Sequence, residues 1–520
     1  MEHRLRGRIP IIRKIRSITH QPGISVGVIY HGRAVLRHNS GVLDVGRAQI
    51  PPSSETVYCV GSLTMAFMTA SIDLLVQDKK LSWDSSVKYI IPEFDRSDAC
   101  ASMTVRDICS HRTGLAGLDE IIHGLDGRIL VAKKDVVKVC NALPAKHEFR
   151  TQFCYNNALY ALAGTIVERV SGLATWGDFQ RHYIFQPLQM TGTTATRPFH
   201  QHDRNMATPH IVLADGNPFR IVQTELSADS MNGGAGRYIL ASRQPPHGGG
   251  GRAVRHPVLQ LDSFVFTRTT IGNADSPLDG DYCLGWCYHH TPAKLGLVSP
   301  NRALASPTLG KDSPSIPIYG HQGHVPGYAC SWYLIPDTEA AVIVLSNGTG
   351  HSDATDWIAQ GLIQTMCDLL PAIDFLAVAD MATRRYLDHY SRGFNAPLDA
   401  SRRLDTVMPL VSDFCGSYAM KNLEDIVTVE PMTVNKQPSQ GWEMFHYHFD
   451  VFCHLPMNLD HCLVRGLCRS SWSSFLISFT RSSEGAIDGL VWKLDDIDVR
   501  FFRVLDRGGP NRSWWGTVFD

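Results

Sequence analysis

The sequence lacks the features that would assign a chain of this size to a class at once. Its formal net charge is −1 over 520 residues, so no overall field favours nucleic acid or an anionic membrane as a partner. No apolar stretch is long enough to cross a bilayer. The basic N-terminus holds only a short apolar run, residues 9–12, so we expect no signal peptide.

The sequence also lacks the signature of a disulfide framework. Its thirteen cysteines are scattered along the chain, and their number is odd. A secreted framework needs cysteines in pairs, whereas reduced thiols are usual in the cytosol. We therefore expect a cytoplasmic protein with free thiols.

The apolar residues are numerous enough for a large core. Hydrophobic residues make up 44% of the chain and charged residues 19%, as in soluble globular proteins. Because a single core rarely grows to 520 residues, the length favours two domains.

Apolar periodicity predicts a mixture of strands and helices in the first 370 residues. Short β-branched runs bounded by turn residues predict strands, and apolar residues three and four apart predict amphipathic helices. Strands are predicted over residues 23–30, 34–37, 332–335 and 341–345, and helices from Ser62, over 158–170 and over 353–370.

The pattern changes in two later stretches. Residues 376–405 are polar with helical spacing, which predicts a connector, and the short strand patterns at 475–480, 489–494 and 499–504 predict a small antiparallel sheet or barrel. Residues 244–251, Gln-Pro-Pro-His-Gly-Gly-Gly-Gly, cannot pack into a core. They indicate a loop, either a real insertion or an irregularity of the gene model.

Three short motifs follow one another along the chain. Ser62 opens a predicted helix and is followed by Met65, Tyr155-Asn156-Asn157 precedes a second helix, and His321-Gln322-Gly323 comes near the end of the first 370 residues. In this order, the motifs resemble those of the serine β-lactamase and penicillin-binding-protein superfamily. The His-x-Gly form resembles the esterase and acyltransferase branch of that superfamily.

The resemblance implies a fold and a domain organisation. Residues 1–375 would form an α/β (α+β) domain of the β-lactamase/transpeptidase kind, with a central antiparallel sheet flanked by helices. Residues 376–405 would connect it to a small all-β domain over residues 406–520, which resembles the lipocalin-like domain of some relatives.

Ser62 is the candidate nucleophile. A serine at a helix N-terminus is surrounded by exposed N–H groups, but it needs a base to become a good nucleophile. By resemblance, the N–H groups of Ser62 and of His324, after Gly323, would form the oxyanion hole. Tyr155 and His321 are the candidate bases, with reference pKa values of about 10 and 6.5.

Asn157 and Met65 complete the implied site. By resemblance, Asn157 positions the acyl group of the substrate. The family has a lysine where this chain has Met65, and that lysine helps to remove the proton of the serine. Methionine carries no charge, so a phenolate on Tyr155 would be roughly 10- to 100-fold less populated. General-base help is worth about 10²–10⁴-fold in total.

We expect no metal and no cofactor. Cys283, Cys287, His289 and His290 superficially resemble zinc ligands. However, Tyr282-Cys283-Leu284-Gly285-Trp286 is similar to a strand motif of the superfamily. His111 is expected to be a hydrogen-bonded structural residue.

The leading functional hypothesis is a β-lactamase-type serine hydrolase or acyltransferase. It would act on an ester, thioester or amide of a small secondary metabolite, with an acyl carrier protein or a coenzyme A thioester as a conceivable acyl donor. One alternative is a non-covalent isomerase, cyclase or lyase that uses Tyr155 as acid and His321 as base. Another is a catalytically inactive binding protein, because a fold alone does not establish a function.

Overall fold

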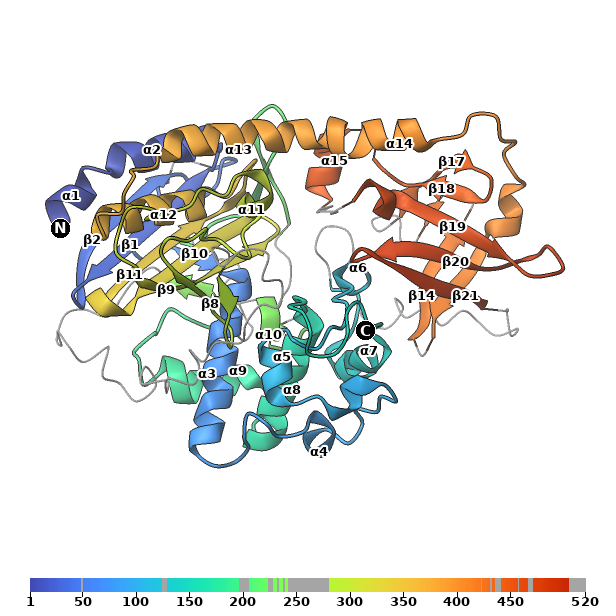
Figure 1. The fold of residues 1–520 in the computed structure, drawn as a ribbon, viewed down its shortest axis with the longest axis horizontal. Helices are drawn as coiled ribbons and strands as arrows, with labels where there is room; N and C mark the ends of the chain where they lie inside the picture. The colour runs from blue at the N-terminus through green and yellow to red at the C-terminus, as the bar shows by residue number, and fades with distance from the viewer. Residues whose placement is uncertain are drawn as a thin grey trace.

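The computed structural model describes most of the chain, and Figure 1 shows how its elements are arranged. The described residues are 1–47, 50–123, 129–195, 205–222, 228–231, 233–236, 239–241, 280–421, 423–430, 433–434, 441–456, 458–465 and 471–504. The glycine-rich stretch 244–251, for which we predicted a loop, lies outside these ranges.

A seven-stranded antiparallel sheet forms the centre of the first 370 residues. Its strand order is β2-β1-β11-β10-β9-β8-β7. The strands are β1 (Gly23–Tyr30), β2 (Arg33–Gly41), β7 (Asp281–Tyr282), β8 (Cys287–His290), β9 (Pro317–Val325), β10 (Tyr328–Ile335) and β11 (Ala340–Ser346). Both predicted hairpins, β1–β2 and β10–β11, are confirmed.

Helices pack against this sheet and bury its apolar side chains. The N-terminal helix α2 contacts α12 and α13, and apolar residues of β1, β10, β11 and α12 belong to one core cluster with α2. A larger cluster joins α3 and α8. The bounds of these helices are α1 (Glu2–Arg6), α2 (Ile9–Ile18), α3 (Thr64–Gln77), α8 (Asn157–Ser171), α12 (Ala354–Met366) and α13 (Phe375–His389).

Shorter elements surround α3 and α8. The helices are α4 (Val87–Ile90), α5 (Val105–Cys109), α6 (Asp119–Ile122), α7 (Val136–Ala142), α9 (Trp176–Gln180), α10 (Gly233–Gly236) and α11 (Asn301–Leu304). The strands are β3 (Val57–Cys59), β4 (His210–Val212), β5 (Pro218–Arg220), β6 (Ile239–Ala241) and β12 (Gly348–Thr349).

Capping residues explain where two predicted helices begin. The Asn156 side chain accepts a hydrogen bond from the Leu159 amide and starts α8, which ends at Gly172 in the left-handed region, with φ +74°. Asp353 accepts from the amides of Thr355 and Asp356 and starts α12. The helices predicted over 158–170 and 353–370 are therefore confirmed, with Asp353 as the cap of the second.

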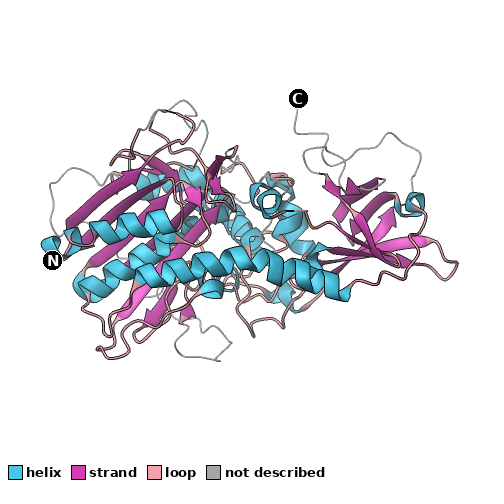
Figure 2. Ribbon diagram, turned by 90° about the horizontal axis from the view of Figure 1, so that it is seen from above, coloured by secondary structure: helices cyan, strands magenta, loops and turns pink. Residues whose placement is uncertain are grey.

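A long helical segment leads from the first sheet to a second one. It consists of α13, a π-helical turn over Tyr390–Asn395 and α14 (Ala396–Ser401). Figures 1 and 2 show it running along one side of the molecule to the C-terminal strands. The helical character expected for 376–405 is confirmed, whereas the domain boundaries stay a prediction.

The C-terminal strands form a nine-stranded antiparallel sheet. Its order is β16-β15-β14-β13-β21-β20-β19-β18-β17, and the end strands β16 and β17 are separated along the chain only by Met444. Aromatic rings of Phe414, Tyr418, Phe452 and Phe479 pack together in it. The bounds are β13 (Gly416–Met420), β14 (Leu423–Glu430), β15 (Thr433–Val434), β16 (Trp442–Glu443), β17 (Phe445–His448), β18 (Val451–Cys453), β19 (Leu476–Arg481), β20 (Ile487–Leu494) and β21 (Ile497–Val504), with α15 (Leu459–Val464) between β18 and β19.

Two searches of the described ranges gave negative results. No helix there is both long and apolar enough to cross a membrane. Within the same ranges, no group of three or more His, Cys, Asp or Glu side chains could hold a metal ion.

Candidate active site

Ser62 lies in a tight turn between β3 and α3. The turn is a 3₁₀ helix over Gly61–Leu63, and α3 continues it from Thr64. Ser62 is half-buried, whereas Met65, one turn further along, is completely buried. The Ser62 side chain therefore stands at the N-terminal end of a long helix, where free N–H groups and the helix dipole favour a developing negative charge.

Glycines bring this turn against strand β9. Gly61 has φ +53°, and a Cβ atom there would lie 2.9 Å from the His324 amide nitrogen. A side chain on Gly323 would collide with the Val60 carbonyl. The Cys330 thiol donates to the same Val60 carbonyl over 2.9 Å. The backbone of Ser62 and that of His324 are thus held close together, as an oxyanion hole requires.

Tyr155 reaches this place from the residue before the α8 cap. Its hydroxyl donates a hydrogen bond to the Met65 sulfur over 3.2 Å. Removal of water from the hydroxyl raises the pKa of Tyr155 well above its usual value, and a hydrogen bond with Ser62 only partly offsets this. Tyr155 is therefore a neutral phenol at neutral pH.

The segment before α6 holds the neighbouring asparagines. The Asn156 amide group donates to the carbonyls of Leu115 and Ala116, at 3.1 and 3.0 Å. Asn157 donates to Asp119 over 2.7 Å. Burial raises the pKa of Asp119 to about 6, although the bond from Asn157 opposes this change. Asn157 is thus oriented by a carboxyl group that titrates near neutral pH.

His321 is buried and bonded to groups other than Ser62 and Tyr155. Its Nδ1 lies 2.6 Å from the Gln322 carbonyl oxygen, and its Nε2 lies 3.1 Å from the Tyr282 hydroxyl. Burial lowers the pKa of His321 to about 4, so the ring is neutral. With Nδ1–H donating to the carbonyl, Nε2 accepts the Tyr282 proton.

Tyr282 lies on the opposite side of Met65 from Tyr155 in this chain of contacts. Its hydroxyl is 3.8 Å from the Met65 sulfur, and the whole side chain is buried. Burial raises the pKa of Tyr282 well above its usual value. Met65 therefore touches two neutral phenols, which is the place where a cation would affect both.

The comparisons with known proteins give the family. A model of the family described as Beta-lactamase matches residues 11–365. This match spans more than half of the chain. The chain belongs to the β-lactamase family. A solved structure of the octameric penicillin-binding protein homologue from Pyrococcus abyssi superposes with a TM-score of 0.54 at 18% identity, covering 95% of this chain and 98% of that one.

Two curated relatives of this β-lactamase-family chain are fungal proteins. An unguisins hydrolase of Aspergillus violaceofuscus is 31% identical over 33% of this chain. Another, from Aspergillus campestris, is 24% identical over 69% of this chain. The matched parts span 31% and 65% of these relatives.

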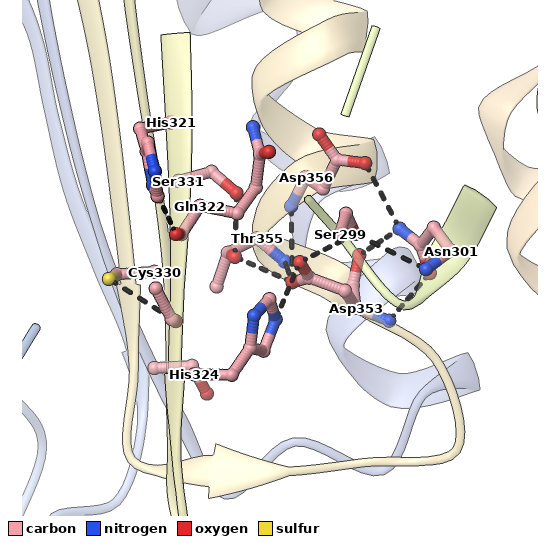
Figure 3. Close-up of polar contacts among 12 residues, drawn as sticks. Ser299, Asn301, His321, Gln322, His324, Cys330, Ser331, Asp353, Thr355 and Asp356 are labelled. Atoms are coloured by element: carbon pink, nitrogen blue, oxygen red, sulfur yellow. Dashed lines mark hydrogen bonds and ion pairs between the residues drawn. The ribbon is translucent and has the colours of Figure 1, made fainter. Parts of the chain in front are cut away.

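His324 turns its side chain away from the candidate site. Alternation along β9 places Gln322 and His324 on the side of α12 and His321 on the other, as Figure 3 shows. The His324 ring lies 2.9 Å from the buried Asp353 carboxylate, and this ring lowers the pKa of Asp353 against the effect of burial. The pair fastens β9 to α12, and only the His324 backbone faces Ser62.

His111 also has a structural setting in this family member. Its Nδ1 accepts the Asn156 amide over 3.1 Å, and its ring packs against Tyr155, Tyr160 and Tyr282. Burial, with a smaller effect from His321, keeps the pKa of His111 far below its usual value. This contact pattern agrees with the structural role predicted for it.

Sequence reasoning missed two members of the site. Tyr282 was assigned only to a strand motif, and Asp119 was not singled out. A tyrosine at the start of the Tyr-x-Leu-Gly-Trp motif was a usable signal for Tyr282, because buried phenols need a hydrogen-bond partner. No local pattern marks Asp119.

Proposed function

We propose that this β-lactamase-family chain is a serine hydrolase of a small secondary metabolite related to unguisins. It would cleave an amide, ester or thioester bond through an acyl group on Ser62. The observation that carries the proposal is the convergence of Ser62, the hydroxyl of Tyr155 and the His324 backbone at the N-terminal end of α3. The names of the two Aspergillus relatives support the substrate class.

We take Met65 to occupy the position of the family lysine, which leaves Tyr155 without a cationic neighbour to stabilise a phenolate. A neutral phenol still serves as a proton relay. As Ser62 Oγ attacks the carbonyl carbon, its proton passes to the Tyr155 oxygen, and the Tyr155 proton passes to the leaving nitrogen or oxygen. Water then attacks the acyl group, its proton moves to Tyr155, and Tyr155 returns a proton to Ser62.

The other polar groups position this relay. Asn157, oriented by Asp119, would hold the acyl group, and the amides of Ser62 and His324 would bind the oxyanion. We assign His321 a supporting role through Tyr282, because its two nitrogens bond Gln322 and Tyr282. We further propose that the C-terminal sheet is a lipocalin-like barrel, and that the protein acts in the cytoplasm.

An acyltransferase variant of the same chemistry uses another acceptor in place of water. A hydroxyl or amine of a metabolite would then attack acyl-Ser62, and an acyl carrier protein or a coenzyme A thioester would be the donor. The first half-reaction is the same in both cases, so a test for acyl-Ser62 covers both.

The experiment is to detect that acyl group. The parent protein and the Ser62→Ala variant are incubated with a fluorophosphonate and with a p-nitrophenyl ester, and intact masses are recorded. We expect an adduct on the parent and none on the variant. A parent that forms no adduct with either reagent contradicts the proposal.

A second candidate function has its own supporting observation. Because Tyr155 keeps its proton at neutral pH, it suits a general acid, and the apolar Met65 suits a hydrophobic substrate. The pocket would then isomerise, cyclise or eliminate without a covalent intermediate. Turnover that survives Ser62→Ala and collapses in Tyr155→Phe would favour it. Binding without turnover in either variant or the parent would favour an inactive scaffold.

A further inference from the structure

The β20–β21 hairpin of the C-terminal sheet contacts the wall of the candidate active site. Its turn consists of Asp495 and Asp496, between the paired residues Leu494 and Ile497. One Asp495 oxygen accepts the Gly117 amide over 2.8 Å, and the other accepts the Lys146 ammonium over 2.9 Å. Figure 1 shows β20 reaching toward α6, which follows Gly117 along the chain.

Gly117 belongs to the segment that holds the catalytic asparagines and Tyr155. A Cβ atom on Gly117 would lie 3.3 Å from the Tyr155 carbonyl oxygen, so the two backbones are in contact. The neighbouring carbonyls of Leu115 and Ala116 hold Asn156. Lys146 is joined to the same segment, because its amide donates to the Gly114 carbonyl over 2.8 Å. Asp495 thus grips both sides of one short backbone pairing.

The turn residues are poorly explained by the turn itself. Asp495 and Asp496 have φ values of +47° and +62°, where glycine or asparagine is adopted with less strain. Their carboxylates, however, face Lys146, which is 3.9 Å from Asp496 as well. The neighbouring Leu494 is buried in the same apolar cluster as Leu115 and Leu118. The hairpin is therefore anchored by both charge and apolar packing.

We propose that the Asp495 hairpin is a positioning element of the active site. By fixing residues 114–119 it sets the placement of Tyr155 and Asn157, so the C-terminal sheet takes part in substrate positioning on the catalytic part of the same chain. This inference rests on the proposed function, because it concerns how that site holds its acyl substrate. Asp495 itself touches no reacting atom.

The test compares variants of the full-length protein. Asp495→Asn keeps the shape and removes the charge, Asp495→Ala removes both contacts, and Lys146→Met removes the ion-pair partner, with Lys146→Arg as the conservative rescue. Asp498→Asn is the matched control, because it makes the same charge change at an exposed position of β21. Thermal unfolding of each variant checks that it is folded.

Two measurements separate contact from function. Hydrogen exchange reports whether residues 114–119 lose protection, and we expect exchange at the Gly117 amide to rise about 10-fold or more in Asp495→Ala. Kinetics with a p-nitrophenyl ester report positioning, and we expect kcat/KM to fall about 10- to 100-fold, as a misplaced substrate does. Lys146→Arg and Asp498→Asn should keep parental values in both measurements.

The pH profile gives a readout that a merely structural contact would not move. The charged and titratable groups that act on Asp119 include Asp495 on the hairpin and Tyr155 before α8. The Asp495 charge raises the pKa of Asp119, after the larger effect of burial. Asp495→Asn should therefore move the acidic limb of kcat/KM to lower pH, because Asp119 stays ionised further into acid.

The outcomes distinguish this inference from the proposed function. A parent that neither forms an adduct nor turns over the ester overturns the proposed function and this inference together. An active parent whose Asp495→Ala variant keeps parental kcat/KM and pH profile overturns this inference alone. Increased exchange with unchanged kinetics does the same, because the contact would then be structural only.

Discussion

Met65→Lys tests whether a missing positive charge limits the acylation of Ser62. The Met65 sulfur lies 3.2 Å from the Tyr155 hydroxyl and 3.8 Å from the Tyr282 hydroxyl, so an ammonium in its place would meet both phenols. An opposite charge at this distance typically lowers a pKa by roughly 1–3 units, or about 1.4–4 kcal/mol. We expect Ser62 to be acylated about 10- to 100-fold faster at neutral pH, within the range of general-base catalysis.

The same substitution should lower the stability of the protein. Met65 is completely buried, and burial of an ammonium costs several kcal/mol unless its partners compensate. Hydrogen bonds to the two phenols and a lowered lysine pKa would offset part of this cost. We therefore expect faster acylation together with a lower unfolding temperature, which is the pattern of a functional group placed in a strained setting.

Met65→Gln is the matched control, because glutamine has a similar length and bonds the phenols without a charge. The assay is the rate constant for covalent labelling by a fluorophosphonate, measured by intact mass from acid to alkaline pH. The reasoning is refuted if folded Met65→Lys labels no faster than Met65→Gln and the parent. Equal acceleration by both variants would point to hydrogen bonding rather than charge.

Three further changes probe the phenols and His321. Tyr155→Phe removes the proton relay and should lower kcat for a p-nitrophenyl ester by about 10²–10⁴-fold, with little change in the far-ultraviolet circular dichroism spectrum. Tyr282→Phe leaves the buried Nε2 of His321 without its donor and should lower the free energy of unfolding by about 1–3 kcal/mol in urea titrations; an unchanged value would contradict the hydrogen bond. The low pKa of His321, about 4 against 6.5 when unfolded, means that the unfolded chain binds the extra proton first. Stability should therefore decrease as pH falls from about 6.5 to 4, by up to about 3 kcal/mol from this group, and His321→Gln should flatten that slope.

Local pattern was sufficient for the elements that carry the site. The β-branched run of β1 and the apolar spacing after Ser62 predicted a strand and a helix where they occur, because each element buries one side chain face. Asp353 and Gly172 marked helix ends through capping, which depends only on a few neighbouring residues. The sheet order followed from resemblance and not from these patterns.

Contacts between distant residues were beyond local pattern. Asp495 meets Gly117 across 378 positions, and the Asn157–Asp119 bond depends on how two loops fold together. The helix α2 also went unpredicted, since its apolar residues were considered only as a possible signal sequence. The direction in which His324 points became definite only with the register of β9 and the place of Asp353 behind it.

The oxyanion part of the site and the proton-transfer part depend on different residues. The glycines Gly61 and Gly323 allow the close approach of the Ser62 turn to β9, and neither contact involves Met65. In serine proteases, an oxyanion hole and substrate binding alone retain about 10³–10⁴-fold catalysis when the proton-transfer residues are removed. Replacement of a lysine by Met65 therefore removes a factor of similar size while the backbone geometry stays in place. A chain of this kind can keep a slow acyl transfer on a tightly bound substrate, and Met65→Lys should raise kcat far more than it changes KM.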